Sequence, residues 1–240
     1  MRRHMFRWSP ARIIAGAFGS ISFIGSILLY LPWGHMPGQS ITYVDALYTA
    51  VSALCVTGLS IVDTAAVFNP FGQAILAVLI QVGGLGVSTM GAGVLLMLGR
   101  KVGIRQRNLI HDTMNLDSYS GVVRFLRTLF ATTVFIEVIG AFLGYFVFRR
   151  DYEMMESIRL SIFHSISSFN NAGLTILTKE RSMEMYAEDP FMLILTTALV
   201  FVGGLGFIVI RECWVNRFRW RKLSMHSRVS IFMAVFLLIG

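Results

Sequence analysis

Two glycine motifs recur in the same order along this chain, and their repetition constrains the fold more than any other feature. Gly58 lies in the segment Val-Thr-Gly-Leu-Ser, and Gly173 lies in Asn-Ala-Gly-Leu-Thr, 115 residues further on. A second motif, Val-Gly-Gly-Leu-Gly, occupies 82–86 and again 202–206, 120 residues apart. Whole units of chain are therefore repeated, and we predict two structural copies that differ by five loop residues.

The composition is that of an integral membrane protein. Hydrophobic residues make up 55% of the chain and charged residues 14%, whereas charged residues approach a quarter of a soluble domain. The mean hydropathy is +0.67. A bilayer core about 30 Å thick requires about 20 apolar residues per helix. Four stretches are long enough to span the bilayer: 13–31, 71–98, 122–148 and 191–210. A fifth apolar stretch, 229–240, is cut short, which predicts that the chain is the start of a longer protein.

The positions of the basic residues predict the topology. The formal net charge is +8, yet 32–70 contains no Lys or Arg. Basic residues gather in 1–12, 99–121 and 213–228, which the positive-inside rule places in the cytoplasm together with the N-terminus. Charges placed in this way indicate membrane topology and contact with anionic lipids, and they argue against a nucleic-acid partner. The motifs that contain Gly58 and Gly173 are then on the outer side of the cell membrane.

A short amphipathic stretch precedes each of these glycines. The stretches, 43–54 and 158–169, are helical in character and too short to cross a bilayer, so we predict re-entrant helices. Non-helical backbone at membrane depth persists only where protein or water surrounds it, and its carbonyl groups can replace the hydration shell of an alkali cation. Gly58 and Gly173 can adopt the positive φ that such a loop requires. The alternative is a pair of ordinary outer loops, and the aligned repetition argues against it.

With these motifs the chain resembles the potassium-translocating subunits of the Trk/Ktr/HKT superfamily. The resemblance rests on Val-Thr-Gly-Leu at 56–59, Gly-Gly-Leu-Gly at 83–86 and Phe-His-Ser-Ile-Ser-Ser-Phe-Asn-Asn-Ala-Gly at 163–173. It implies an all-α integral membrane fold of parallel pore repeats, with two of an expected four in this chain. The repeats would cover 13–98 and 122–212, a third would begin at 229, and the short N-terminal segment favours the Ktr type.

The resemblance also implies a potassium filter made of backbone carbonyl groups. The filter segments would be 55–60 and 170–175, and K⁺ would be the transported ion, with Na⁺ as a candidate coupling or activating ion and no cofactor. Gating residues are expected beyond Gly240, and two walls alone are not expected to conduct selectively. The filter carbonyls would belong to Cys55, Val56, Thr57, Gly58, Asn170, Asn171, Ala172 and Gly173.

Other residues of the spans have less specific interpretations. The glycines of 83–93 and 203–206 predict close helix packing in preference to a hinge or a cavity lining. We predict that Glu137, deep in the third span, is either a hydrogen-bonded packing residue or a residue of the ion pathway. We predict that His164 packs against its neighbours within the second re-entrant helix. No nucleophile, carboxylate pair or phosphate-binding loop is present, so the sequence does not predict an enzyme. The two cysteines lie on opposite sides of the predicted membrane, which excludes a disulfide between them.

Three alternatives differ in function. A sodium-permeable transporter could share this architecture. An alternating-access carrier would have inverted repeats, whereas both copies here run in the same direction. A membrane receptor or scaffold would expose polar outer loops in place of an apolar run that ends in glycine. The partners implied by the resemblance are a cytoplasmic nucleotide-sensing regulatory ring and a second copy of the full-length subunit.

Overall fold

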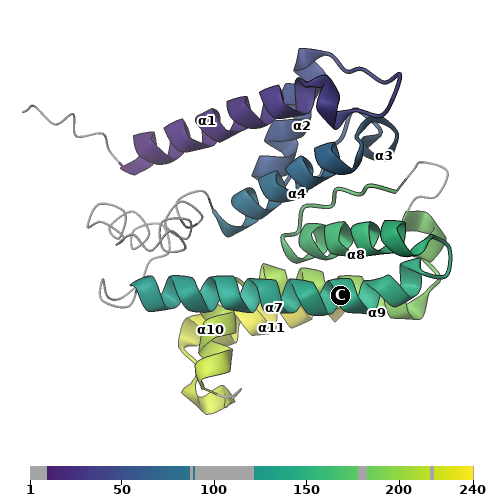
Figure 1. Ribbon diagram of the computed structural model, residues 1–240. Helices are drawn as coiled ribbons and strands as arrows, with labels where there is room; N and C mark the ends of the chain where they lie inside the picture. The colour runs from purple at the N-terminus through teal and green to yellow at the C-terminus, as the bar shows by residue number, and fades with distance from the viewer. Residues whose placement is uncertain (1–9, 87–88, 90–121, 178–182, 217–218, 240) are drawn as a thin grey trace, which may run out of the picture.

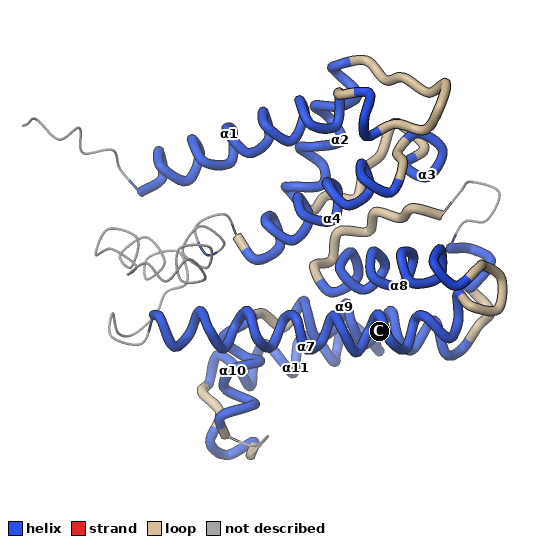
Figure 2. The backbone as a smooth tube through the Cα atoms, viewed as in Figure 1, coloured by secondary structure: helices blue, strands red, loops and turns tan. Residues whose placement is uncertain are grey.

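A computed structural model describes residues 10–86, 89, 122–177, 183–216 and 219–239. These residues form helices and loops, and within them the only β-type pairing is one isolated bridge between His35 and Phe68. The all-α prediction is therefore confirmed for this part of the chain (Figure 2). The predicted loop 99–121 and the second half of the predicted span 71–98 lie outside the described residues, apart from 89.

Each copy contains, in the same order, a long helix, a shorter helix before the glycine motif and a helix that carries the Gly-Gly-Leu-Gly motif (Figure 1). In each copy the short helix before the glycine motif, α2 or α8, contacts the helix before it and the helix after it. The copies meet where α4 contacts α8. The first copy contains α1 (Pro10–Tyr30), η1 (Pro32–Gly34), α2 (Tyr43–Cys55), α3 (Thr64–Val67) and α4 (Pro70–Leu85). The second contains α7 (Val122–Phe148), α8 (Met154–Phe169), η4 (Met183–Tyr186), α9 (Pro190–Gly204) and α10 (Phe207–Val215), and η5 (Trp220–Lys222) and α11 (Met225–Ile239) follow.

Matching polar caps start the helix that follows each glycine loop. The side chain of Asn69 accepts hydrogen bonds from the backbone N–H groups of residues 71 and 72, and Pro70 occupies the first turn. Asp189 and Pro190 repeat this arrangement at the start of α9, 120 residues further on. An Asx cap followed by proline satisfies free N–H groups and fixes the first helical φ. The start of α4 and α9 is therefore set by local sequence.

The last glycine of each Gly-Gly-Leu-Gly motif interrupts its helix. Gly86 and Gly206 both have a φ of +81°, outside the helical region. α4 ends at Leu85, and α9 and α10 meet at an angle of 98°. The sequence predicted one continuous span over 191–210. The structure breaks that span, because a glycine at positive φ cannot continue a right-handed helix.

Helix lengths distinguish the membrane-crossing candidates. Among the described residues, Leu126–Phe148 alone is long and apolar enough to cross a bilayer as a single helix, and the bent pair of α9 and α10 passes the same test together. Four shorter apolar helices cover Ile14–Tyr30, Tyr43–Cys55, Pro70–Leu85 and Met225–Leu238. One hydrophobic cluster, which includes Ala50, Phe68, Phe169 and Leu199, continues through both copies.

Candidate functional site

The first glycine loop begins where α2 ends. A reciprocal capping box between Thr42 and Asp45 starts this helix. At its other end Val56 adopts a left-handed conformation with φ +57°, and Gly58 follows with φ +74°. The N–H of Thr57 donates to the carbonyl of Ser52, a residue in the last turn of α2, at 3.0 Å. The chain therefore leaves the helix by a sharp turn, in which a β-branched residue occupies an unfavourable region.

The second glycine loop has the same backbone, 115 residues further on. Asn171 has φ +58° and Gly173 has φ +69°. The N–H of Ala172 donates to the carbonyl of Ser167 at 2.8 Å, as Thr57 does to Ser52. Besides the glycines, Val56 and Asn171 are the residues with positive φ in the described chain. The left-handed position thus recurs at matching sites of the two loops, where Asn171 adopts it readily and the β-branched Val56 is an outlier.

Each loop is also attached to its own helix by a serine side chain. The Oγ of Ser52 donates to the carbonyl of Leu59 at 2.5 Å, and the Oγ of Ser167 donates to the carbonyl of Leu174 at 2.6 Å. The loops are thus supported from the helix side, and the opposite side of the backbone stays available.

The two loops lie against each other. A Cβ atom on Gly58 would be 2.6 Å from the carbonyl oxygen of Ala172 and 3.5 Å from the Cα of Gly173. Beyond the glycines, the hydroxyl of Thr64 donates to the carbonyl of Thr175 in the other copy. A side chain at position 58 would therefore separate the loops.

Within the part of the chain that the structure describes, none of the eight carbonyls of 55–58 and 170–173 accepts a hydrogen bond. α2 and α8 also end at these loops, and a helix C-terminus carries roughly half an elementary negative charge. Unpaired carbonyl oxygens near two negative helix ends can coordinate a cation. The structure places the two predicted segments side by side at Gly58, Ala172 and Gly173.

Glycines on α4 and α9 allow these helices to approach the ends of α2 and α8 closely. A Cβ atom on Gly83 would overlap the carbonyl of Leu54 at the end of α2, and one on Gly203 would overlap the carbonyl of Phe169 at the end of α8. The predicted packing role is confirmed for these two positions. The hinge alternative fits Gly206 better, since α9 breaks there.

Polar side chains fill the space behind the second loop. The Nδ2 of Asn170 lies 3.0 Å from the Oε1 of Gln81 and 3.3 Å from the Oε1 of Glu137. The Oγ of Ser165 donates to the backbone carbonyl of Glu137 at 2.8 Å. Glu137 is therefore hydrogen-bonded. Sequence reasoning missed Gln81, although a lone amide in an apolar span beside Gly-Gly-Leu-Gly was a detectable signal.

His164 packs inside its own copy. Its ring forms an edge contact with Phe148, with the ring centroids 5.9 Å apart, and its Nε2 lies 3.1 Å from the hydroxyl of Thr196. The predicted packing role of His164 is confirmed. No group of three His, Cys, Asp or Glu side chains that could hold a metal ion occurs among the described residues, and Cys55 and Cys213 are free thiols.

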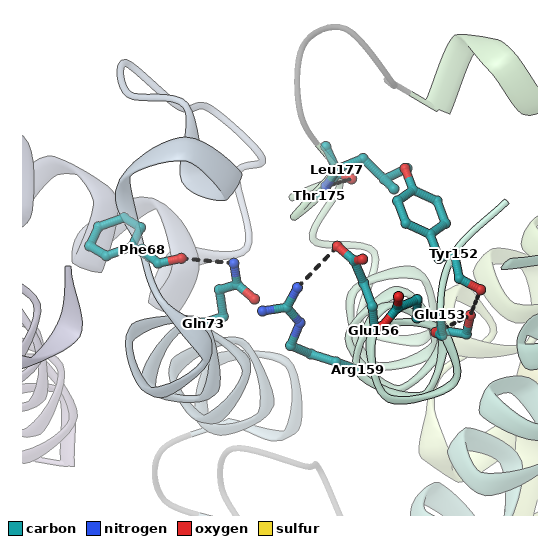
Figure 3. A network of polar contacts seen from close by, with 9 residues as sticks. Phe68, Gln73, Tyr152, Glu153, Glu156, Arg159, Thr175 and Leu177 are labelled. Atoms are coloured by element: carbon teal, nitrogen blue, oxygen red, sulfur yellow. Dashed lines mark hydrogen bonds and ion pairs between the residues drawn. The ribbon is translucent and has the colours of Figure 1, made fainter. Parts of the chain in front are cut away.

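The contact between α4 and α8 continues beside the loops. Figure 3 shows Gln73 on α4 and Arg159 on α8 turned toward the space between the two helices. The Nε2 of Gln73 donates to the carbonyl of Phe68 at 2.8 Å, and Arg159 pairs with Glu156 at 3.4 Å. Each of these bonds stays within its own copy.

Comparison with known proteins links these features to one family. The chain matches the TrkH family, described as cation transport protein, over residues 10–232. It is 36% identical to the potassium/sodium uptake protein NtpJ of Enterococcus hirae over 98% of this chain and 51% of that protein. It is 34% identical to the Ktr system potassium uptake protein B of Bacillus subtilis over 94% of this chain and 49% of that protein. The chain spans about half the length of the curated relatives it matches.

Proposed function

Because this chain belongs to the TrkH family of cation transport proteins, we propose that it supplies two walls of a potassium-selective pore in a Trk/Ktr-type uptake protein. The carbonyl oxygens of 55–58 and 170–173 replace the water around a K⁺ ion as it enters from outside. One observation carries the proposal: both loops share the same left-handed positions, and their carbonyls accept no hydrogen bond from the described residues.

The helix lengths fit pore repeats of this kind. α2 has 13 residues and α8 has 16, so at 1.5 Å per residue they are about 20 Å and about 24 Å long. Neither length reaches across a bilayer core about 30 Å thick. Each would enter the membrane from outside and end near its middle, where its negative end attracts the cation. The chain would thus provide two of four repeats around one pore.

Sodium permeation is the second candidate. One relative is named a potassium/sodium uptake protein. The two walls also differ in sequence, with Cys55 and Thr57 in one and Asn170 and Ala172 in the other. Unequal walls can hold carbonyl oxygens at unequal distances from the ion, which would weaken the discrimination between K⁺ and Na⁺.

The cytoplasmic side would bind the regulatory partner. In the proposed topology η5 and its surroundings face the cytoplasm, and Arg219, Arg221 and Lys222 are exposed there. Exposed basic residues at this level attract anionic lipids or an acidic surface of a nucleotide-sensing ring. A homodimer of complete subunits on such a ring completes the proposed assembly.

Transport by the complete protein tests the proposal. Expressed in cells that lack potassium uptake, the wild type should support growth at low K⁺ and take up Rb⁺ with little competition from Na⁺. Gly58→Ser should reduce this selectivity, because a Cβ at position 58 meets the carbonyl of Ala172. Gly19→Ala is the matched control, since no atom lies within 4 Å of its Cβ position. Unchanged selectivity in Gly58→Ser would contradict the filter assignment, and Rb⁺ uptake fully inhibited by equimolar Na⁺ in the wild type would favour the sodium-permeable alternative.

A further inference from the structure

The second carbonyl wall is attached to the first copy by side chains that the repeat does not predict. The amide cluster consists of Gln81 on α4, Asn170 at the end of α8, and Glu137 on α7. The Nδ2 of Asn170 lies within hydrogen-bond distance of Gln81 at 3.0 Å, of Glu137 at 3.3 Å and of the carbonyl of Ile166 at 2.9 Å. Asn170 is thus fixed by three acceptors on three helices.

Among the described residues of the first copy there is no equivalent cluster. Cys55 occupies the position that corresponds to Asn170, and it is exposed. Asn170 in contrast is 8% exposed, and its Oδ1 is buried without a hydrogen-bond donor among the described residues. A buried amide with one unsatisfied oxygen costs free energy. Retaining it requires a compensating role, and its location directly before the carbonyls of 171–173 suggests one.

We infer that the amide cluster positions the second filter wall relative to the first and thereby sets cation selectivity, an inference that rests on the proposed function. Gln81 and Glu137 act as positioning residues, because they hold Asn170 and do not face the ion. A wall that shifts by a few tenths of an ångström changes the distance between the carbonyls and the cation. A small, dehydrated Na⁺ gains from such a shift relative to K⁺.

Gly84 provides a test that leaves every hydrogen-bonding group in place. A Cβ atom at this position would overlap the Oδ1 of Asn170, so Gly84→Ala should displace the Asn170 side chain. The matched control is Gly204→Ala in the second copy, where the nearest atom belongs to the side-chain amide of Asn171 and is 3.9 Å away. Loss of one hydrogen bond corresponds to about fivefold in an equilibrium. We expect Gly84→Ala to reduce the K⁺/Na⁺ selectivity of the complete protein about fivefold, and Gly204→Ala to leave it unchanged.

A donor exchange tests the hydrogen bonds themselves. Asn170→Asp replaces the donating Nδ2 by an acceptor opposite Glu137, so selectivity and the unfolding midpoint of the purified protein should both fall. Adding Glu137→Gln supplies a donor to the new carboxyl group and should restore part of both quantities, because the carbonyl of Ile166 still faces an acceptor. Val138→Ala, an exposed neighbour of Glu137, is the control for altering this part of α7.

The two readouts separate this inference from the proposed function. If the double variant regains its unfolding midpoint, the amide cluster is a structural link. If at the same time the wild type does not discriminate K⁺ from Na⁺, the proposed function is contradicted. Additive effects of the two substitutions on midpoint and selectivity, or equal selectivity of Gly84→Ala and Gly204→Ala, would overturn the inference.

Discussion

The hydroxyl of Ser52 donates to the backbone carbonyl of Leu59 at 2.5 Å, across the whole first glycine loop. Ser167 and Leu174 repeat the relationship at 2.6 Å in the second copy. Each serine lies in the last turn of the helix before the loop, and each acceptor follows the left-handed glycine. The bond therefore closes both ends of the loop onto one helix, and each wall holds its shape within its own copy.

Removing this hydroxyl should loosen one wall without unfolding the protein. Ser167→Ala removes the hydrogen bond to Leu174, and Ser52→Ala removes those to Leu59 and to the hydroxyl of Thr57; each bond contributes about 1 kcal/mol. We expect correct insertion and a K⁺/Na⁺ selectivity reduced severalfold, measured as Rb⁺ uptake in competition with Na⁺. Ser20→Ala on α1, an exposed serine bonded within its own helix, should behave as the wild type. Equal selectivity of all three variants would show that the serines do not support the filter.

The packing glycines make a different prediction, for stability. Gly83→Ala and Gly203→Ala place a methyl group on the carbonyl of Leu54 or of Phe169, and backbone on both sides leaves it little room. Overpacking of this kind costs about 1–3 kcal/mol or more. Both variants should have a lower unfolding midpoint in detergent, whereas Gly19→Ala should not. An unchanged midpoint in Gly203→Ala would contradict the close approach of α9 to α8.

The repeated motifs predicted the family and much of the fold. The family match over residues 10–232 confirms the resemblance to Trk/Ktr proteins. The predicted helix 43–54 differs from α2 (Tyr43–Cys55) by one residue at its end, and the predicted span 122–148 has the same bounds as α7. These segments are long apolar or amphipathic runs with polar ends, so local composition alone defines them.

Features that depend on contacts between distant segments were less predictable. The break between α9 and α10 arises at Gly206, within a run that is apolar on both sides. α8 begins at Met154, earlier than the predicted start at 158, because its first turn contains the charged Glu156, which an apolar pattern excludes. The link from Gln81 to Asn170 joins residues 89 positions apart. Hydropathy does not reveal such pairing, since it records each residue without its neighbours in space.

The orientation predicted from the basic residues can be tested by labelling. In a background with Cys55→Ala and Cys213→Ala, a cysteine at exposed Gln39 should react with a membrane-impermeant maleimide in intact cells. A cysteine at exposed Arg219 should react after the membrane is permeabilised. The reverse pattern would show that the glycine loops face the cytoplasm.

Acid should weaken the start of α9 through Asp189. The N–H of Met192, then the charge of Arg150 and the N–H of Phe191, hold the pKa of this carboxyl below its ordinary value of 3.8. A carboxyl whose pKa is lower in the folded state contributes stability that is present above the unfolded value and is lost as the pH falls through the folded value. Asp189→Asn keeps the oxygen that caps α9 and removes the charge next to Arg150, which lies 2.6 Å away. Its unfolding midpoint should therefore be lower than that of the wild type at pH 7, and the difference should shrink below pH 3.8. A difference that stays constant down to pH 3 would mean that the charge of Asp189 does not stabilise this end of the helix.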